Sequence, residues 1–190
     1  PDGSRVAFRW KGENEDNWDL YVKALDGSGL DRVTKLAAED CCPAWSPGGH
    51  DIAFLRRQGN RYAISLASLL SDEVRALIDI SNPSRLSWSP DGRSIAFSEK
   101  QSPEGTSSIW SLSIATSERV RLTTPEERRF RDDSPAYSPD GRYLAFIRRQ
   151  NAGGPELFIM RLPDGSPKRL TDYHSPTSFC WTGDSREIVY

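Results

Sequence analysis

The apolar residues of this chain gather in short runs that are apolar at consecutive positions rather than at alternate ones. The most regular runs begin with an aliphatic residue and end with an aromatic ring: Val6-Ala7-Phe8, Ile52-Ala53-Phe54, Ile95-Ala96-Phe97, Leu144-Ala145-Phe146 and Ile188-Val189-Tyr190. Runs this short, bounded by turn residues, are typical of β-strands. Because successive strand residues face opposite sides, consecutive apolar positions predict a sheet that is covered on both faces.

A turn motif of the form aromatic-Ser-Pro-Asp-Gly stands before these runs. Its copies, which we call the anchors, lie at 1–3, 46–49, 89–92, 138–141 and 182–185, with steps of 43 to 49 residues between equivalent positions. Proline presets φ for the first corner of a type I turn, and glycine takes the left-handed conformation that closes a three-residue hairpin loop. Each anchor is therefore predicted to join two antiparallel strands.

The same four-strand phrase surrounds each anchor, and we name its strands A to D in chain order. Strand A precedes the anchor at 43–45, 135–137 and 179–181, and strand B is the apolar run that follows it. Strand C is predicted at 20–22, 62–64, 109–110 and 157–159, and strand D at 32–34, 76–78, 121–123 and 169–171. A period of 40 to 50 residues with several short strands per unit is typical of β-propeller blades. A β-sandwich also has many short strands, but it does not need one recurring phrase.

The fold class predicted is therefore all-β, a propeller of four-stranded antiparallel blades with about four blades' worth present. The phrase supplies strands B, C and D of a first blade, three complete blades, and strands A and B of a last one, which makes seventeen strands. A closed four-bladed ring has sixteen strands, so we expect residues 1–190 to be a single segment of a six- to eight-bladed ring. Incomplete terminal blades would expose strand edges, and such edges favour self-association.

Charge and composition exclude several classes of partner. The chain has 25 basic and 27 acidic residues in 190, so no overall positive field attracts nucleic acid or anionic lipid. No apolar stretch is long enough to span a bilayer, and we expect no membrane insertion in this segment. Cys41, Cys42 and Cys180 match no zinc spacing and are odd in number, so we interpret them as small core residues; adjacent cysteines form a disulfide only with strain.

Catalytic motifs are absent from the sequence. It has two histidines, His50 and His174, and it lacks a Gly-x-Ser-x-Gly nucleophile elbow, a glycine-rich phosphate loop and a His-Glu-x-x-His helix. We therefore expect no enzyme activity, no cofactor and no metal. Two alternatives stay open, namely His174 paired with a nearby serine and two carboxylates brought together from separate blades.

The candidate binding surface is the face formed by the B–C and D–A loops, because the anchors on the opposite face are nearly identical and read as structural. The candidate partner-binding residues on this face are Arg56, Arg57, Arg128, Arg129, Arg131, Arg148, Arg149 and His174. Together the arginines suit the carboxylates of an acidic protein or peptide partner. The alternative is that they are solvated or paired with Glu126, Glu127 and Asp132. Asp40 and Asp133, just before strand A at the predicted mouth of the channel, are read as turn caps or as ligands of a cation.

The phrase Pro-Ala-Trp-Ser-Pro-Asp-Gly, followed by an Ile-Ala-Phe strand, an aromatic strand and Arg-Leu-Thr, resembles the TolB-like β-propeller repeat. The resemblance covers nearly the whole chain and departs from the pattern at Gly48 and at 183–185. The repeat is similar in fold to the periplasmic component of the bacterial Tol-Pal envelope system. It also resembles propellers appended to bacterial transcription regulators and protein kinases, and the gating propellers of prolyl-oligopeptidase-type peptidases.

Two functions follow as expectations from the residues and the resemblance. The first is a non-catalytic interaction or sensing module that binds a protein or peptide through the B–C and D–A loop face. The second is the gating propeller of a serine peptidase whose hydrolase domain lies outside this chain. The resemblance implies a periplasmic or otherwise extracytoplasmic location, or a cytoplasmic one if the propeller is fused to a regulator or kinase without export.

Overall fold

The computed structural model describes residues 1–12, 17–81, 83–100, 106–125, 130–150, 153–171 and 176–190. Within these residues the chain forms seventeen β-strands and no helix, as the repeated phrase predicts. The strands divide between two compact units, Pro1–Ser81 and Asn82–Tyr190. That all 190 residues form a single propeller segment stays a prediction.

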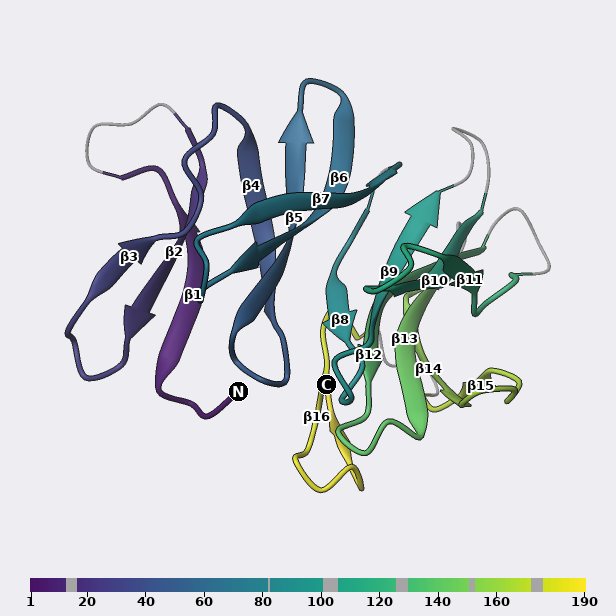
Figure 1. The fold of residues 1–190 in the computed structure, drawn as a ribbon. Helices are drawn as coiled ribbons and strands as arrows, with labels where there is room; N and C mark the ends of the chain where they lie inside the picture. The colour runs from purple at the N-terminus through teal and green to yellow at the C-terminus, as the bar shows by residue number, and fades with distance from the viewer. Residues whose placement is uncertain (13–16, 82, 101–105, 126–129, 151–152, 172–175) are drawn as a thin grey trace. The chain divides into compact units, whose positions relative to one another are not determined.

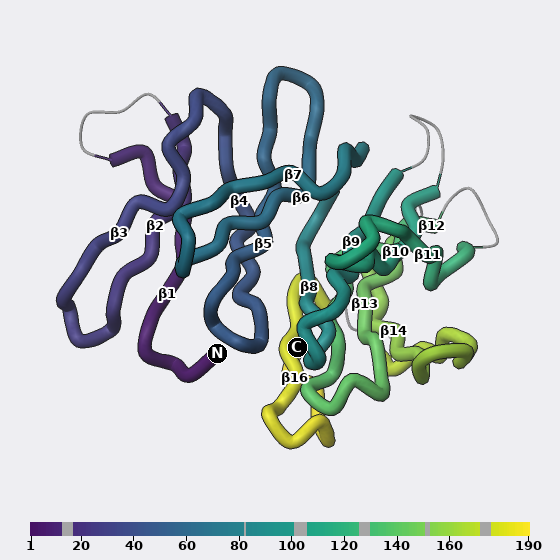
Figure 2. The backbone as a smooth tube through the Cα atoms, in the orientation of Figure 1, coloured from purple at the N-terminus to yellow at the C-terminus, as the bar shows by residue number. Residues whose placement is uncertain are grey.

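The first unit contains strands B to D of one blade and a complete second blade (Figure 1). The first three strands, β1 (Arg5–Trp10), β2 (Asp19–Ala24) and β3 (Leu30–Arg32), form one antiparallel sheet. The next four pair in chain order, and they are β4 (Glu39–Trp45), β5 (Asp51–Gln58), β6 (Arg61–Ser68) and β7 (Val74–Ile80). The backbone trace in Figure 2 shows this blade as a series of hairpins.

The second unit contains two complete blades and the first two strands of another. The first blade consists of β8 (Leu86–Trp88), β9 (Ser94–Lys100), β10 (Ser107–Ser113) and β11 (Arg119–Arg121). The second consists of β12 (Phe130–Tyr137), β13 (Tyr143–Gln150), β14 (Glu156–Arg161) and β15 (Lys168–Arg169). Strands β16 (Cys180–Trp181) and β17 (Ile188–Val189) form the last hairpin. One parallel bridge, Ser107 to Arg131, connects the two complete blades.

The core of each unit lies on the second strand of its complete blades. In β5, Ile52, Ala53 and Phe54 are fully buried, and the corresponding apolar runs of β9 and β13 are fully buried too. Ile52 and Phe54 pack against Leu20 and Val22 of β2, which belongs to the neighbouring sheet. Strand B is therefore covered on both sides, as its consecutive apolar residues predict.

The four anchors that lie between two strands form the predicted hairpin turns. Gly92 and Gly141 have φ values of 71° and 72°, and Ser185 takes the same left-handed conformation with φ of 62°. In the anchor at 138–141, Ser138 Oγ donates a 2.6 Å hydrogen bond to Asp140 Oδ1, which also accepts the Arg142 N–H at 3.0 Å. These hydrogen bonds, the one from Ser138 above all, lower the pKa of Asp140 to about 2. The turn thus holds its carboxylate in the charged form.

Strand D ends earlier than predicted wherever its sequence is Arg-x-Thr. Strands β3, β11 and β15 end at the arginine, so Thr34, Thr123 and Thr171 lie outside the ladder. Each threonine hydroxyl instead accepts a backbone N–H of strand C, from Leu20 at 2.9 Å and from Ile109 and Leu157 at 3.0 Å. The side chain replaces the carbonyl that a longer strand would supply. Strand β7, which lacks this motif, continues for seven residues.

Candidate partner-binding face

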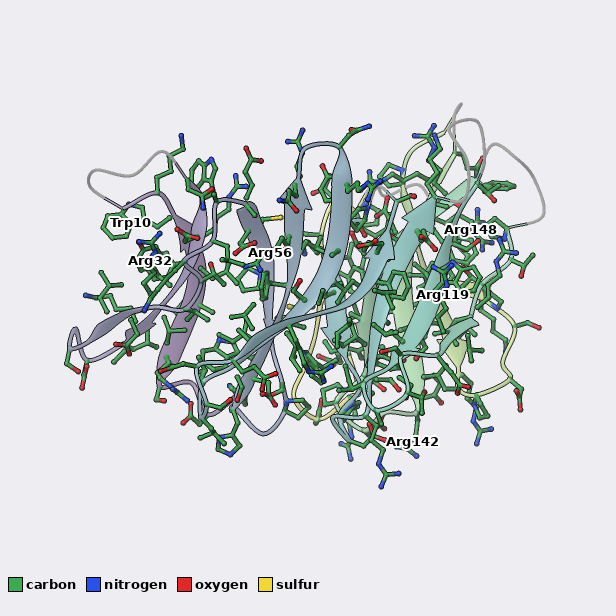
Figure 3. All side chains as sticks on the ribbon, turned by 45° about the horizontal axis from the view of Figure 1, so that its top comes forward. Trp10, Arg32, Arg56, Arg119, Arg142 and Arg148 are labelled. Atoms are coloured by element: carbon green, nitrogen blue, oxygen red, sulfur yellow. The ribbon has the colours of Figure 1, made fainter. Side chains whose placement is uncertain are left out.

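Of the three complete blades described above, those of β4–β7 and β12–β15 are rich in arginine at the end that carries the B–C and D–A loops. In the sheet of β4 and β5, Asp40 stands directly opposite Arg56, and in the sheet of β12 and β13, Asp132 stands opposite Arg148. Figure 3 labels Arg56 and Arg148 among the side chains of their units. The first strand of a blade therefore begins beside the end of its second strand, and the predicted arginines lie where these two strands meet.

The inner position at this end is a buried, two-pronged ion pair. Arg56 donates from Nε and Nη2 to the two carboxylate oxygens of Asp40, at 2.8 Å each. Arg148 makes the same pair of bonds with Asp132, at 2.6 and 2.8 Å. Both aspartate side chains are fully buried, and both arginine side chains are 16% exposed. Paired carboxylate and guanidinium groups satisfy each other in this geometry, so we assign both pairs to the structure of the blade.

Aromatic rings also contact the guanidinium groups of these two arginines. The guanidinium of Arg148 lies 4.6 Å from the centre of the Phe158 ring, and that of Arg56 lies 5.1 Å from the Phe54 ring. Contact with ring faces stabilises a cation that has lost most of its water. The two possibilities left open for Asp40, a turn cap and a cation ligand, are therefore both replaced by an arginine pair.

The next position outward differs between the two blades. In the first unit Glu39 stands opposite Arg57, and the two side chains form a 3.3 Å ion pair that is about half exposed. In the second unit the same position holds Arg131 opposite Arg149, two like charges. Arg149 turns away to Asp133, with 2.6 Å between Nε and Oδ2. Arg131 is exposed and pairs with no carboxylate in the described part of the chain.

Three of the predicted residues, Arg128, Arg129 and His174, lie outside the described residues. Arg56 and Arg57 belong to the first unit, and Arg131, Arg148 and Arg149 to the second. Of these five, Arg131 is the residue with no carboxylate partner among the described residues, and Arg149 lies beside it. We call these two residues of the second unit the arginine rung.

Sequence reasoning named Asp132 as an alternative partner of the arginines but did not identify Asp40 as the partner of Arg56, although a signal was present. An aspartate stands five residues before the anchor aromatic at Asp40 and at Asp132, and an arginine follows the strand B phenylalanine by two residues at Arg56 and Arg148. Because the two spacings recur together in two blades, they indicate the same cross-strand pair of aspartate and arginine in each.

Other site types find little support in the structure. Among the described residues, no group of three or more His, Cys, Asp or Glu side chains gathers in a way that could hold a metal ion. In the same part of the chain no helix is long and apolar enough to cross a membrane.

Neither family models nor curated proteins match this chain. Solved structures do match it. TolB from Acinetobacter baumannii is 25% identical with a TM-score of 0.80 over 97% of this chain and 46% of that one. A putative TolB from Agrobacterium tumefaciens is 22% identical with a TM-score of 0.75, over 89% and 61% of the two chains.

A prolyl endopeptidase structure is 14% identical with a TM-score of 0.72, over 92% of this chain and 29% of that one. This chain therefore spans less than two thirds of the length of each of these proteins. Strand order, buried second strands, left-handed anchors and the TolB structures all agree: the chain has a TolB-like β-propeller fold.

Proposed function

We propose that this chain is a non-catalytic interaction module that binds an acidic segment of a protein or peptide through the B–C and D–A loop face. The observation that carries the proposal is the arginine rung of the second unit, where Arg131 stands opposite Arg149. The TolB-like fold supports an interaction role, since a propeller presents loops on a rigid scaffold.

Electrostatics give the rung its preference for anions. Like charges directly opposite each other on neighbouring strands destabilise a sheet, and the other blade avoids this with its Glu39–Arg57 pair. Asp133 compensates one of the two charges of the rung and leaves Arg131 in solvent. A guanidinium group binds carboxylates through two parallel hydrogen bonds, so an acidic side chain from a partner is the complementary group.

We also propose an extracytoplasmic location in a bacterium, which is the location implied by the resemblance to the TolB-like repeat. The likeness to the two TolB structures supports this part of the proposal.

The proposal is tested by titrating a fluorescent oligoglutamate peptide into the chain and measuring its anisotropy. Arg131→Glu is expected to weaken binding at least tenfold, because it replaces the exposed cation by an anion. Arg93→Glu makes the same change of charge at an exposed position beside the anchor turn between β8 and β9, in the other complete blade of the second unit, and it is the matched control. Equal weakening by both variants would contradict a site and indicate a general effect of net charge.

The second candidate function is the gating propeller of a prolyl-oligopeptidase-type peptidase, favoured by the match to a prolyl endopeptidase over 92% of this chain. It requires a hydrolase domain with a Gly-x-Ser-x-Gly elbow encoded in the same reading frame. Reading that frame and assaying the full-length product on proline-containing peptides distinguish the two functions. Hydrolysis by that product would favour the gating role over the interaction role.

A further inference from the structure

Two cysteines occupy an irregular position in β4, directly after the buried Asp40. The pairing of β4 with β5 is regular up to Cys41, breaks, and resumes at Ala44. Within this bulge Cys42 has φ of 58°, a left-handed conformation that non-glycine residues adopt at a cost of about 1–2 kcal/mol. Cys41 is half-buried, and Cys42 and Cys180 are exposed, so the interpretation of the three cysteines as core residues is wrong.

The bulge itself does not require cysteine. Strand β12 breaks its pairing with β13 at the same place, between Asp133 and Ala136, and Ser134 there has φ of 54°. The same backbone is thus formed by Asp-Ser in one blade and by Cys-Cys in the other. The two thiols are an addition to a shared structure.

The left-handed residue brings the two sulfur atoms together. Successive side chains of a regular strand point to opposite faces, which would separate the sulfurs of Cys41 and Cys42. In the bulge their Sγ atoms are instead 3.2 Å apart and share a hydrogen bond. A disulfide bond is about 2.05 Å long, so the remaining approach is about 1.2 Å.

We propose that Cys41 and Cys42 form a redox-active dithiol site whose co-reactant is a small-molecule disulfide of the glutathione class. The exposed Cys42 attacks one sulfur of that disulfide as a thiolate, and the first small thiol leaves. Cys41 then gives up its proton and attacks Cys42 Sγ in the mixed disulfide, and the second small thiol leaves with that proton. The two cysteines lose two electrons and two protons in all, and the small disulfide gains them.

The product is a bond between adjacent residues, and it is expected to break as readily as it forms. Neighbouring Cα atoms across a trans peptide are about 3.8 Å apart, below the 4.4 Å lower limit of ordinary disulfides. Strain of this kind makes a disulfide easier to reduce, which suits a reversible modification and not a permanent cross-link. The hydrogen bond between the sulfurs, together with burial, raises the pKa of the Cys41 thiol, in keeping with Cys42 as the first nucleophile.

The test exposes the reduced full chain to oxidised glutathione, blocks remaining thiols with iodoacetamide, and weighs the tryptic peptides. Cys41 and Cys42 lie together in the peptide 36–56, and Cys180 lies in 170–186. We expect the peptide 36–56 to lose the mass of two hydrogens and both alkylation sites, and to recover both sites in excess reduced glutathione. Cys180→Ser is expected to leave this result unchanged.

The single variants make the test decisive. Cys42→Ser places in the bulge the residue that β12 already has there, so the fold is expected to persist. Both Cys41→Ser and Cys42→Ser should lose the two-hydrogen change, since one cysteine can form only a mixed disulfide. A wild-type chain that accumulates glutathione adducts or chain-to-chain disulfides at 36–56, without the two-hydrogen change, would overturn the proposal. So would an oxidised pair that excess reduced glutathione does not restore.

Discussion

Strands β4 and β12 carry the same seven-residue frame in two blades, Glu-Asp-Cys-Cys-Pro-Ala-Trp in one and Arg-Asp-Asp-Ser-Pro-Ala-Tyr in the other. The shared aspartate is fully buried in both and binds an arginine of strand B with two hydrogen bonds. The residue before it is Glu39 in one blade and Arg131 in the other, and the two residues after it are thiols in one and Asp-Ser in the other. The shared aspartate forms a buried ion pair in both blades, whereas the positions that differ are exposed or half-buried.

The comparison shows that an arginine at a strand end does not have one fixed structural role. Arg56 and Arg148 satisfy buried carboxylates, and Arg57 is paired at the surface. Arg131 occupies the position of Glu39 and reverses its charge. The residue that stands opposite on the neighbouring strand decides whether such an arginine can form a cross-strand ion pair.

The largest effect is expected from removing the shared aspartate. Asp132→Ala leaves Arg148 mostly buried without its carboxylate, and breaking a buried pair in this way costs about 3–5 kcal/mol of unfolding free energy. Asp40→Ala should behave alike, since its geometry is the same. Urea unfolding followed by fluorescence measures both. Glu39→Ala, at a half-exposed position, is the control and should change stability by less than about 0.5 kcal/mol. A loss below about 1 kcal/mol for both aspartates would contradict a shared structural pair.

A smaller loss is expected where strand D ends in Arg-x-Thr. Thr123→Val removes the hydroxyl that accepts the buried Ile109 N–H, and an unsatisfied buried donor costs about 1–3 kcal/mol. Thr124→Val changes the next residue, which is exposed, and should be close to neutral. The measurement is again the urea midpoint. Equal losses of stability in the two variants would show that the hydrogen bond from Ile109 N–H to the Thr123 hydroxyl does not stabilise the fold.

Exchanging the outer charges of the two blades should change stability in opposite directions. Arg131→Glu creates the arrangement of Glu39 and Arg57 in the second unit and is expected to stabilise it by about 0.2–1 kcal/mol. Glu39→Arg creates a like-charged pair in the first unit and should destabilise it by a similar amount. Both differences should shrink in high salt, where exposed charges are screened. A destabilised Arg131→Glu variant would show that Arg131 has a structural role.

The smallest effect concerns the anchor carboxylates. Because the pKa of Asp140 is lowered to about 2, this residue supports the folded state above the ordinary value near 3.8 and loses that support as pH falls through about 2. Ser138→Ala removes the main hydrogen bond, so the pKa of Asp140 should rise towards the ordinary value. A carboxyl-carbon NMR titration measures it, with Asp91 of the equivalent anchor as the internal control. An unchanged Asp140 titration would show that the hydroxyl is not the cause.

The repeated phrase predicted the strand order and the anchors in detail. Hairpin turns, left-handed corners and consecutive apolar positions are local signals, and each was confirmed in the structure, where the described residues form the seventeen predicted strands. The prediction placed the ends of strand D too late, at Thr34, Thr123 and Thr171. Strand propensity does not show that a threonine hydroxyl accepts the strand C N–H in place of a strand D carbonyl.

The candidate partner-binding face shows the same division between local and tertiary signals. The arginines were found at the ends of strand B, but their roles depend on which side chain stands opposite, which is a matter of register between strands. Two residues in register can be far apart in sequence, as Arg131 and Arg149 are. The contact between the sulfur atoms of Cys41 and Cys42 likewise depends on a left-handed bulge, which the sequence Cys-Cys does not predict.

The sequence by itself therefore determined the fold class and the order of its strands. Turns, and strands that are apolar on both faces, can be recognised from residues that are neighbours in sequence. Tertiary structure alone decided which of these arginines has a carboxylate partner among the described residues. It also decided that the sulfur atoms of Cys41 and Cys42 lie close together. The physical reason is that charge compensation and sulfur contact act across space at distances of a few ångströms, where pairing, bulges and burial select the neighbours.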